Sequence, residues 1–194
     1  VRCAAKVPAV VAGQDRCYLC RGTKLWFDEA VALATYDGLL RNWLLEMKRH
    51  HGDRRSLALA DLMWENCGER IAATRPDVVM PVPMHWRRRL VRGTNSPGLA
   101  AEVIAGRLRV PLAAGMVRRT RNTPPQSSVP PSERPGNVRG AFSVRRGYHL
   151  EAARVLVVDD ILTTGSTCSA IARVLKRSGA THVAVAVIGR AGTR

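Results

Sequence analysis

The chain has 194 residues, of which 46% are hydrophobic and 24% charged, and its formal net charge is +16. This length and apolar content suffice for one α/β domain with a small appendage, and they exclude an intrinsically disordered chain. The sequence has no run of about 18 apolar residues and no signal-peptide pattern, so we expect a cytoplasmic protein without membrane insertion. Because the first residue is Val rather than Met, we also expect the natural start to lie upstream.

The positive charge is concentrated in one part of the chain. Between Trp86 and Arg146 there are 13 Arg and two acids, so this segment contributes +11 of the +16. Such a cluster of arginines suits a pyrophosphate or a nucleic-acid backbone, because both present anionic phosphates. A compositional bias is the alternative, since 27 of the 31 basic residues are Arg, as a GC-rich coding sequence would produce at ordinary solvated positions.

From the amino terminus, the first apolar patterns predict elements over residues 30–36 (strand), 38–48 (helix), 55–73 (helix), 77–82 (strand) and 96–108 (helix). Residues 1–27 lack such a pattern and contain three of the five cysteines, so we expect them to form a small module separate from a domain over 28–194. The 3.6-residue spacing in the first helix predicts a core-facing stripe of Leu39, Leu40, Trp43, Leu44 and Met47. Ser96 is a good N-cap and Pro97 suits the first helical position.

The second half of the chain contains a long segment without a regular pattern. Five prolines and Gly136 predict an irregular, mobile loop over 120–138, between short strands at 116–118 and 141–144. A strand then begins at residue 154, a helix with Cys168 on its apolar face follows, and a last strand covers 182–188. Cys67 and Cys168 are expected to be buried rather than reactive, and an odd number of cysteines in a cytosolic chain argues against a disulfide framework.

The most informative stretch is residues 154–167, RVLVVDDILTTGST. Its β-branched run ends in Asp159 and Asp160 and so brings two carboxylates to the carboxyl edge of a parallel sheet, where open α/β folds bind ligands. A helix is expected to open next, and its N–H groups, hydroxyls and positive end suit a phosphate; these residues are Thr163, Thr164, Gly165, Ser166 and Thr167. The pattern predicts a sugar-phosphate site, although an ordinary polar turn followed by a helix cap has the same residue types.

This stretch resembles the 5-phosphoribosyl-1-pyrophosphate (PRPP) motif of type I phosphoribosyltransferases. The resemblance implies an α/β fold with a parallel sheet flanked by helices. It also implies that Asp159 and Asp160 are the catalytic acids that bind the ribose 2′ and 3′ hydroxyls. Residues 163–167 would surround the 5′-phosphate, and Mg²⁺ would accompany PRPP.

A second constellation follows the predicted strand at 77–82. After Pro81-Val82-Pro83, a loop carries guanidinium groups that can bind a diphosphate in bidentate fashion: Arg87, Arg88, Arg89 and Arg92. This segment ends in Arg-Gly-Thr-Asn. It resembles the pyrophosphate loop of the ComF family of competence-associated phosphoribosyltransferase-like proteins. Further segments match that family in order: Tyr36-Asp37-Gly38, then Arg119, Arg121, Thr123 and Gln126, then Arg134, Asn137 and Phe142, and finally Ile188-Gly189-Arg190.

The ComF resemblance also implies an amino-terminal zinc ribbon with two Cys-x-x-Cys pairs. Cys17 and Cys20 form one complete pair, whereas the partner of Cys3 would fall one residue before Val1. Tetrahedral zinc needs four ligands, so Cys3, Cys17 and Cys20 form an incomplete set, and we expect the fourth Cys upstream. A degenerate ribbon without metal is the alternative, and His50, His51 or an exogenous ligand are further candidates.

The resemblance implies transfer of a phosphoribosyl group from Mg²⁺-bound PRPP to an acceptor, in a protein associated with competence and DNA uptake. The proline-rich loop would close over the site, and Arg119, Arg121 and Gln126 would contact the diphosphate or the acceptor. His85 is a further candidate for proton transfer. The alternative is a non-enzymatic protein that senses PRPP or binds single-stranded DNA through its arginine-rich face. No segment indicates the acceptor or the oligomeric state.

Overall fold

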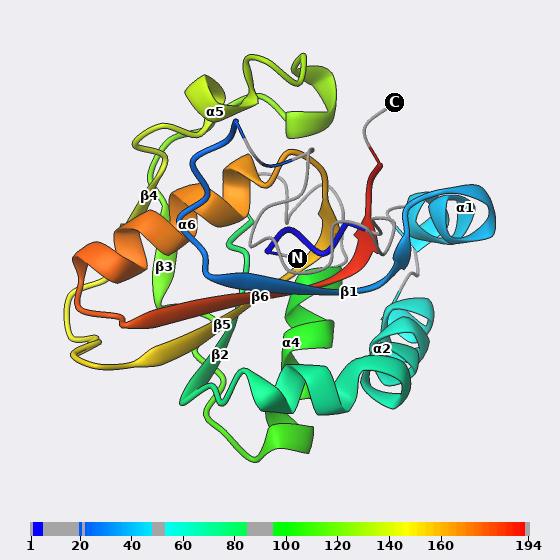
Figure 1. Cartoon of the computed structure of the whole chain (residues 1–194), viewed down its shortest axis with the longest axis horizontal. Helices are drawn as coiled ribbons and strands as arrows, with labels where there is room; N and C mark the ends of the chain where they lie inside the picture. The colour runs from blue at the N-terminus through cyan, green and yellow to red at the C-terminus, as the bar shows by residue number, and fades with distance from the viewer. Residues whose placement is uncertain (1, 6–19, 21, 48–52, 85–94, 193–194) are drawn as a thin grey trace.

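A four-stranded parallel sheet with the strand order β1-β6-β5-β2 forms the centre of the protein (Figure 1). The computed structural model describes residues 2–5, 20, 22–47, 53–84 and 95–192. Its parallel strands are Glu29–Thr35 (β1), Val78–Pro81 (β2), Arg154–Leu162 (β5) and His182–Arg190 (β6). An isolated parallel bridge between Val79 and Leu112 extends the sheet beyond β2.

Helices cover both faces of this sheet (Figure 1). The helices are Gly38–Met47 (α1), Asp53–Ala73 (α2), Ser96–Leu108 (α4), Arg134–Asn137 (α5) and Ser166–Arg177 (α6). α2 and α4 lie against one face, whereas α6 lies against the other together with an antiparallel ribbon of Val117–Arg119 (β3) and Phe142–Val144 (β4). Within the described residues, no helix is both long enough and apolar enough to cross a membrane.

Strand β5 shows why the sheet is buried on both faces. Its side chains alternate, so Val155 and Val157 pack on the side of α6, while Leu156 and Val158 pack on the side of α2 and α4. All four are fully buried. A continuous apolar run is typical of a parallel strand covered on both faces, and the predicted α/β sheet flanked by helices is confirmed.

The predicted elements up to residue 144 are present within two residues of their expected bounds, with two local corrections. Asn95 rather than Ser96 occupies the N-cap of α4, and its side chain makes no capping hydrogen bond. Segment 120–138 is not wholly irregular, because it contains a 3₁₀ turn at Gln126–Ser128 (η2) and the single helical turn α5. Proline at the start of a helical turn loses no intrahelical hydrogen bond, which explains why Pro135 is compatible with α5.

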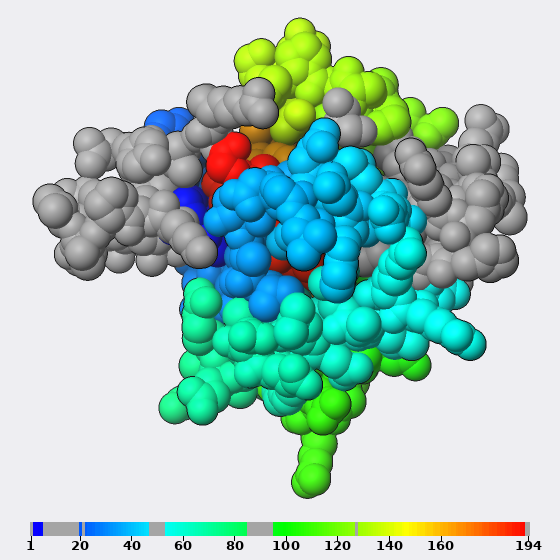
Figure 2. Space-filling model, turned by 90° about the vertical axis from the view of Figure 1, so that its right-hand side faces the viewer, coloured from blue at the N-terminus to red at the C-terminus, as the bar shows by residue number. Residues whose placement is uncertain are grey.

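The apolar face of α1 does not point wholly into the core, contrary to the sequence prediction. Leu44 is fully buried and Leu40 is half-buried, but Leu39 is 70% exposed and Trp43 is 44% exposed. α1 lies beyond the carboxyl end of β1 and spreads over the surface (Figures 1 and 2). Only one row of its side chains has a neighbouring element to pack against, and periodicity alone carries no information about that neighbour.

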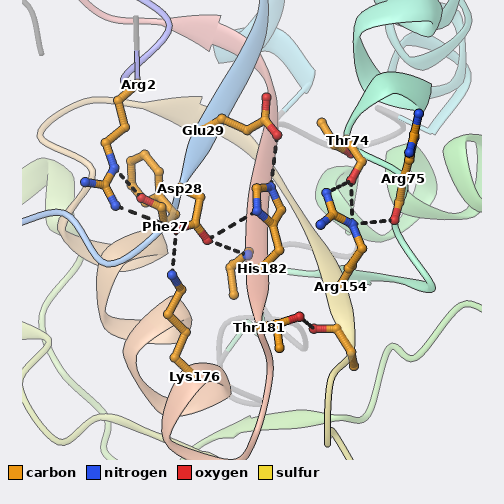
Figure 3. A network of polar contacts seen from close by, with 12 residues as sticks. Arg2, Phe27, Asp28, Glu29, Thr74, Arg75, Arg154, Lys176, Thr181 and His182 are labelled. Carbon is orange, nitrogen blue, oxygen red and sulfur yellow. Dashed lines mark hydrogen bonds and ion pairs between the residues drawn. The ribbon is translucent and has the colours of Figure 1, made fainter. Parts of the chain in front are cut away.

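A polar network joins the carboxyl end of α6 to the beginning of β1 and β6 (Figure 3). The carboxylate of Asp28 accepts hydrogen bonds from Lys176 Nζ at 2.6 Å and from the backbone N–H of Val183 at 2.8 Å. His182 lies beside it, with Nδ1 at 3.7 Å from Asp28 Oδ2 and Nε2 at 2.9 Å from Glu29 Oε1. This network fixes the edge of the sheet opposite the carboxyl ends of the strands.

The charge of Asp28 makes stability depend on pH. Burial alone would raise the pKa of this carboxyl, but the hydrogen bonds from Lys176 and Val183 outweigh burial and lower the pKa below 3.8. The folded-state pKa is thus below the unfolded one, so this stabilisation is present above the unfolded pKa and is lost as pH falls through the folded pKa. We expect Asp28→Asn to reduce the free energy of unfolding by about 1–3 kcal/mol at pH 7 and by much less at a pH below the folded-state pKa of Asp28.

Urea unfolding at both pH values measures this difference. Asp61→Asn is a matched control, because Asp61 forms an exposed ion pair with Arg107 at 3.2 Å, and such pairs contribute about 0–1 kcal/mol. An Asp28→Asn variant as stable as the wild type at pH 7 would contradict the role given to this network.

Candidate functional site

The carboxyl edge of the sheet opens into a pocket of about 430 Å³. Four parts of the chain surround it: the end of β5 with the turn into α6, the residues after β2 and at the start of α4, segment 119–134, and Tyr36 with Leu45 of α1. The lining residues from the first part are Asp159, Asp160, Ile161, Leu162, Thr163, Thr164, Gly165, Ser166, Thr167 and Cys168. In Figure 2, α1 and the yellow-green segment 120–138 lie on neighbouring parts of one face.

The two predicted acids lie side by side on β5 and both line the pocket. Asp159 still pairs with Val187 of β6, and its Oδ1 accepts the backbone N–H of Asp160 at 2.9 Å. The strand does not end at these acids as expected, because the pairing with β6 continues to Leu162. The backbone that carries the acids is therefore paired with β6 both before and after them, rather than placed on a loose turn.

Cys168 lies in the first turn of α6, directly behind Asp159. Its Sγ is 3.9 Å from Asp159 Oδ2, and the residue is 1% exposed. Burial, reinforced by the charges of Asp159 and Asp160, raises the pKa of the Cys168 thiol well above its ordinary value. The thiol therefore stays protonated and is a poor nucleophile, so the predicted core role of Cys168 is confirmed.

The turn between β5 and α6 has the geometry of an anion site. Gly165 occupies the N-cap position with φ +78°, in the left-handed region, and α6 begins at Ser166 rather than at Thr163. The hydroxyls of Thr164 and Ser166 lie 2.7 Å apart and both line the pocket. The first turn of a helix has N–H groups without intrahelical acceptors, so hydroxyls and amides face the same space.

Apolar side chains from the amino-terminal segment lie directly behind this turn. A methyl group added to Gly165 would be 3.2 Å from Leu25 Cδ2 and 3.4 Å from Phe27 Cε1. Leu25 and Phe27 are buried in the same cluster as Leu162 and Cys168. The glycine is therefore required for two reasons, its positive φ and the close approach of these two side chains.

Two arginines from segment 119–134 also line the pocket. The guanidinium of Arg119 lies 5.5 Å from the centre of the Phe142 ring and donates a hydrogen bond to Thr123 Oγ1. Arg134 donates from Nε to the carbonyl of Val129 at 3.0 Å. Their position gives the pocket a positive side suited to a diphosphate or another anion.

Gln126 connects the same segment to the start of α6. Asn137 Nδ2 donates to the carbonyl of Pro124 at 3.1 Å and to Gln126 Oε1 at 2.7 Å, and Gln126 Nε2 then donates to Thr167 Oγ1 at 3.4 Å. A carbonyl can only accept, so Pro124 fixes the orientation of the Asn137 amide, which fixes that of Gln126. The Thr167 hydroxyl therefore accepts from Gln126.

Several predicted site residues lie elsewhere or cannot be placed. Arg121 is exposed and donates to the carbonyl of Arg139 at 2.8 Å, outside the set of residues that line the pocket. Six predicted residues lie outside the described residues: His85, Arg87, Arg88, Arg89, Arg92 and Cys17. Cys3 and Cys20 are buried in one cluster, and no group of three or more potential ligands occurs among the residues that the structure describes.

Some pocket residues were not predicted from the sequence as site residues. Besides Arg134, they are Tyr36, Leu45, Val82, Pro83, Met84, Ser96, Pro97 and Pro125. Tyr36 and Arg134 belong to the segments that match the ComF family, and this match is a signal that could have identified them. Leu45 and Pro97 carry no such signal, because they resemble ordinary helix residues.

The phosphoribosyl transferase domain family matches residues 98–194. Competence protein F of Haemophilus influenzae is 31% identical over 117 residues, which are 60% of this chain and 51% of that protein. DNA utilization protein YhgH of Escherichia coli is 34% identical over 110 residues, 57% of this chain and 48% of that protein. Adenine phosphoribosyltransferase of Mycobacterium avium is 36% identical over 107 residues, 53% of this chain and 57% of that protein. The chain thus spans about half the length of these curated relatives.

Gly165→Ala should destabilise the protein by about 1–3 kcal/mol, because φ +78° is strained for alanine and the new methyl group would press on Leu25 and Phe27. Gly106→Ala is the matched control, since this helical glycine has no atom within 4 Å of an added methyl group. The control should be neutral or up to about 1 kcal/mol more stable. Urea unfolding measures both, and equal stability of Gly165→Ala and wild type would contradict the geometry of the turn.

Proposed function

The chain belongs to the phosphoribosyl transferase family, and from this membership we propose that it binds PRPP in the described pocket and transfers the phosphoribosyl group to an acceptor. The similarity to competence protein F confirms the resemblance to the ComF family. The names of its relatives, competence protein F and DNA utilization protein, support a role of this reaction in the uptake or use of DNA.

One observation carries the proposal. Two adjacent carboxylates, Asp159 and Asp160, line the same pocket as a helix-start turn of amides and hydroxyls, and Arg119 and Arg134 line it as well. Carboxylates accept hydrogen bonds from sugar hydroxyls, a helix start binds a phosphate, and guanidinium groups bind a diphosphate. PRPP contains these three groups in one molecule.

In the proposed reaction, a nucleophilic atom of the acceptor forms a bond to C1 of the ribose while the bond from C1 to the pyrophosphate oxygen breaks. Asp159 and Asp160 fix the ribose, residues 163–167 fix the 5′-phosphate, and Arg119 and Arg134 stabilise the negative charge that develops on the departing pyrophosphate. The predicted arginines at 87, 88, 89 and 92 would add to this stabilisation. No side chain needs to form a covalent intermediate.

Mg²⁺ belongs to the proposal as a partner of the diphosphate. The carboxylate oxygens of Asp159 and Asp160 are the hard ligands that this ion accepts, so the pocket residues fit it. When bound, Mg²⁺ neutralises part of the charge of the diphosphate. Segment 120–138 would exclude water, which otherwise hydrolyses PRPP. The hydrogen bond from Gln126 to Thr167 joins this segment to residues 163–167, which we call the phosphate turn because they would bind the 5′-phosphate.

Zinc is proposed as a structural ion of the amino-terminal segment. The thiols of Cys3 and Cys20 are soft ligands of the kind that zinc prefers, and both lie in one buried cluster. Cys17 and the expected upstream cysteine would complete a four-thiolate set. Such a site would hold residues 1–27 together, since a segment this small has little core of its own.

Isothermal titration with Mg²⁺-PRPP tests the proposal. We expect Asp160→Asn to weaken binding about 10-fold or more, because a charge-assisted hydrogen bond to a ribose hydroxyl is lost, and to abolish the release of pyrophosphate in an acceptor screen. Glu69→Gln on the exposed side of α2 is the matched control and should bind like the wild type. The absence of PRPP binding by the wild type would refute the proposed function.

A second function, binding of single-stranded DNA, is favoured by the surface of the β3-β4 ribbon. Arg118 Nε donates across the ribbon to Ser143 Oγ at 3.1 Å, and the Arg145 N–H pairs with Met116 at 2.9 Å. Segment 116–149 contains one acid, Glu133, whereas its exposed arginines are Arg118, Arg121, Arg139, Arg145 and Arg146. A basic ribbon with Tyr148 exposed beside it suits a nucleic-acid backbone and a stacked base.

The double variant Arg145→Ala, Arg146→Ala should bind a labelled single-stranded oligonucleotide more weakly than the wild type. It should also reduce the slope of log affinity against log salt by about 1.4, because two phosphate contacts are lost at about 0.7 each. Fluorescence anisotropy at several salt concentrations measures both effects. The double variant Arg54→Ala, Arg177→Ala removes the same charge from exposed helix positions. Equal losses in the two double variants would show attraction by net charge rather than a site on the ribbon.

A further inference from the structure

Arg190, the last residue of β6, lies buried behind the phosphate turn. The residue is 7% exposed, and its guanidinium donates to backbone carbonyl groups. Nη1 lies 2.9 Å from the carbonyl oxygen of Leu162 and 2.6 Å from that of Thr163, and it also donates to Ala191. Nε lies 2.8 Å from the carbonyl oxygen of Cys3. One side chain thus connects the end of β5, the turn and the amino-terminal segment.

These contacts fix the direction of two peptide groups at the pocket. In a planar trans peptide, the N–H of one residue points opposite to the carbonyl of the residue before it. Because Arg190 binds the carbonyls of Leu162 and Thr163, the N–H groups of Thr163 and Thr164 point away from Arg190. Both threonines line the pocket. The Leu162 carbonyl also accepts the backbone N–H of Ala191 at 2.9 Å, whereas the short bond to the Thr163 carbonyl comes from Arg190. Arg190 therefore helps to hold the backbone donors that a bound phosphate would use, above all the N–H of Thr164.

The amino-terminal segment supports the same turn from a second direction. Leu25 and Phe27 lie beneath Gly165, as the short distances to an added methyl group indicate. The backbone N–H of Trp26 donates to Ser169 Oγ at 3.0 Å, and Ser169 Oγ also lies 3.4 Å from the carbonyl oxygen of Lys24. Residues 24–27 and Arg190 thus enclose the back of the turn, so its backbone has little freedom to rearrange.

We propose that Arg190 is a positioning residue for the 5′-phosphate, which acts by aligning the backbone of residues 162–164 and does not touch the ligand itself. The inference rests on the proposed function, because it assigns a role in the binding of the same ligand. The planar fork of arginine binds several carbonyls at fixed angles, whereas lysine presents a single ammonium group. Arg190→Lys therefore retains the charge and loses the alignment.

The structure provides a matched control for this substitution at the other end of β5. Arg154 Nε donates to the carbonyls of Thr74 and Arg75 at 3.2 and 2.9 Å, and its Nη2 donates to that of Thr74 at 2.7 Å (Figure 3). Arg154→Lys removes a carbonyl-binding fork of the same kind, but far along the strand from the pocket. It should affect stability without affecting ligand binding.

Isothermal titration with ribose 5-phosphate, and separately with Mg²⁺-pyrophosphate, tests the inference. For Arg190→Lys we expect an affinity for ribose 5-phosphate about 10-fold weaker than that of the wild type, with the affinity for pyrophosphate within about 2-fold. Arg154→Lys should bind both ligands like the wild type. A loss of general stability would not separate the two ligands in this way.

Phe27→Leu keeps the test decisive if Arg190→Lys does not fold. It removes part of the support beneath Gly165 and should also weaken binding of ribose 5-phosphate alone. Equal affinity of wild type and Arg190→Lys for ribose 5-phosphate would overturn the inference while leaving the proposed function intact. Equal losses for both ligands, or the same loss in Arg154→Lys, would also overturn it. A wild type that binds neither ligand would refute the proposed function, and the inference with it.

Discussion

The parallel pairing of β5 with β6 is the interaction on which the site depends. It brings Asp159 opposite Val187 and continues to Leu162 opposite Arg190, beyond the acids. The backbone that carries the carboxylates is therefore fixed by ladder hydrogen bonds. The same register brings Arg190 beside the carbonyls of the phosphate turn. A shift of one residue would move every side chain of β5 to the opposite face of the sheet, so Asp159 and Asp160 would exchange their positions relative to α6.

The motif at 154–167 could be predicted from the sequence because its information is local. A buried strand, two acids and a helix start are adjacent in the chain, and a parallel sheet brings them to one edge. The prediction that the apolar stripe of α1 faces the core was wrong for the opposite reason. Leu39 and Trp43 have the correct spacing, but burial needs a neighbouring element, and α1 has one only along the row of Leu44.

The residues that were missed depend on contacts between distant segments. A buried arginine such as Arg190, bonded to carbonyls, has no sequence pattern, because its partners are backbone atoms that every residue has. Arg134 reaches the pocket only because α5 and η2 give segment 120–138 a defined path. The prolines in the sequence predict an irregular loop and do not indicate this path. The arrangement of the amino-terminal segment behind Gly165 likewise requires residues 25 and 165 to meet in space.

The residues around the pocket are held in different ways, and this difference suits the proposed transfer. Asp159, Asp160 and the turn that follows them belong to β5 and the start of α6. Arg119 ends strand β3, whose Val117 is buried in the same core cluster as Cys168, so the ribbon ties this residue to the core as well. Gln126 belongs to the 3₁₀ turn η2, and its hydrogen bond to Thr167 is long, at 3.4 Å, and therefore weak. In the proposed reaction, ribose and phosphate would bind to the surface fixed by the sheet, and this weak contact would be the first to open when the diphosphate leaves.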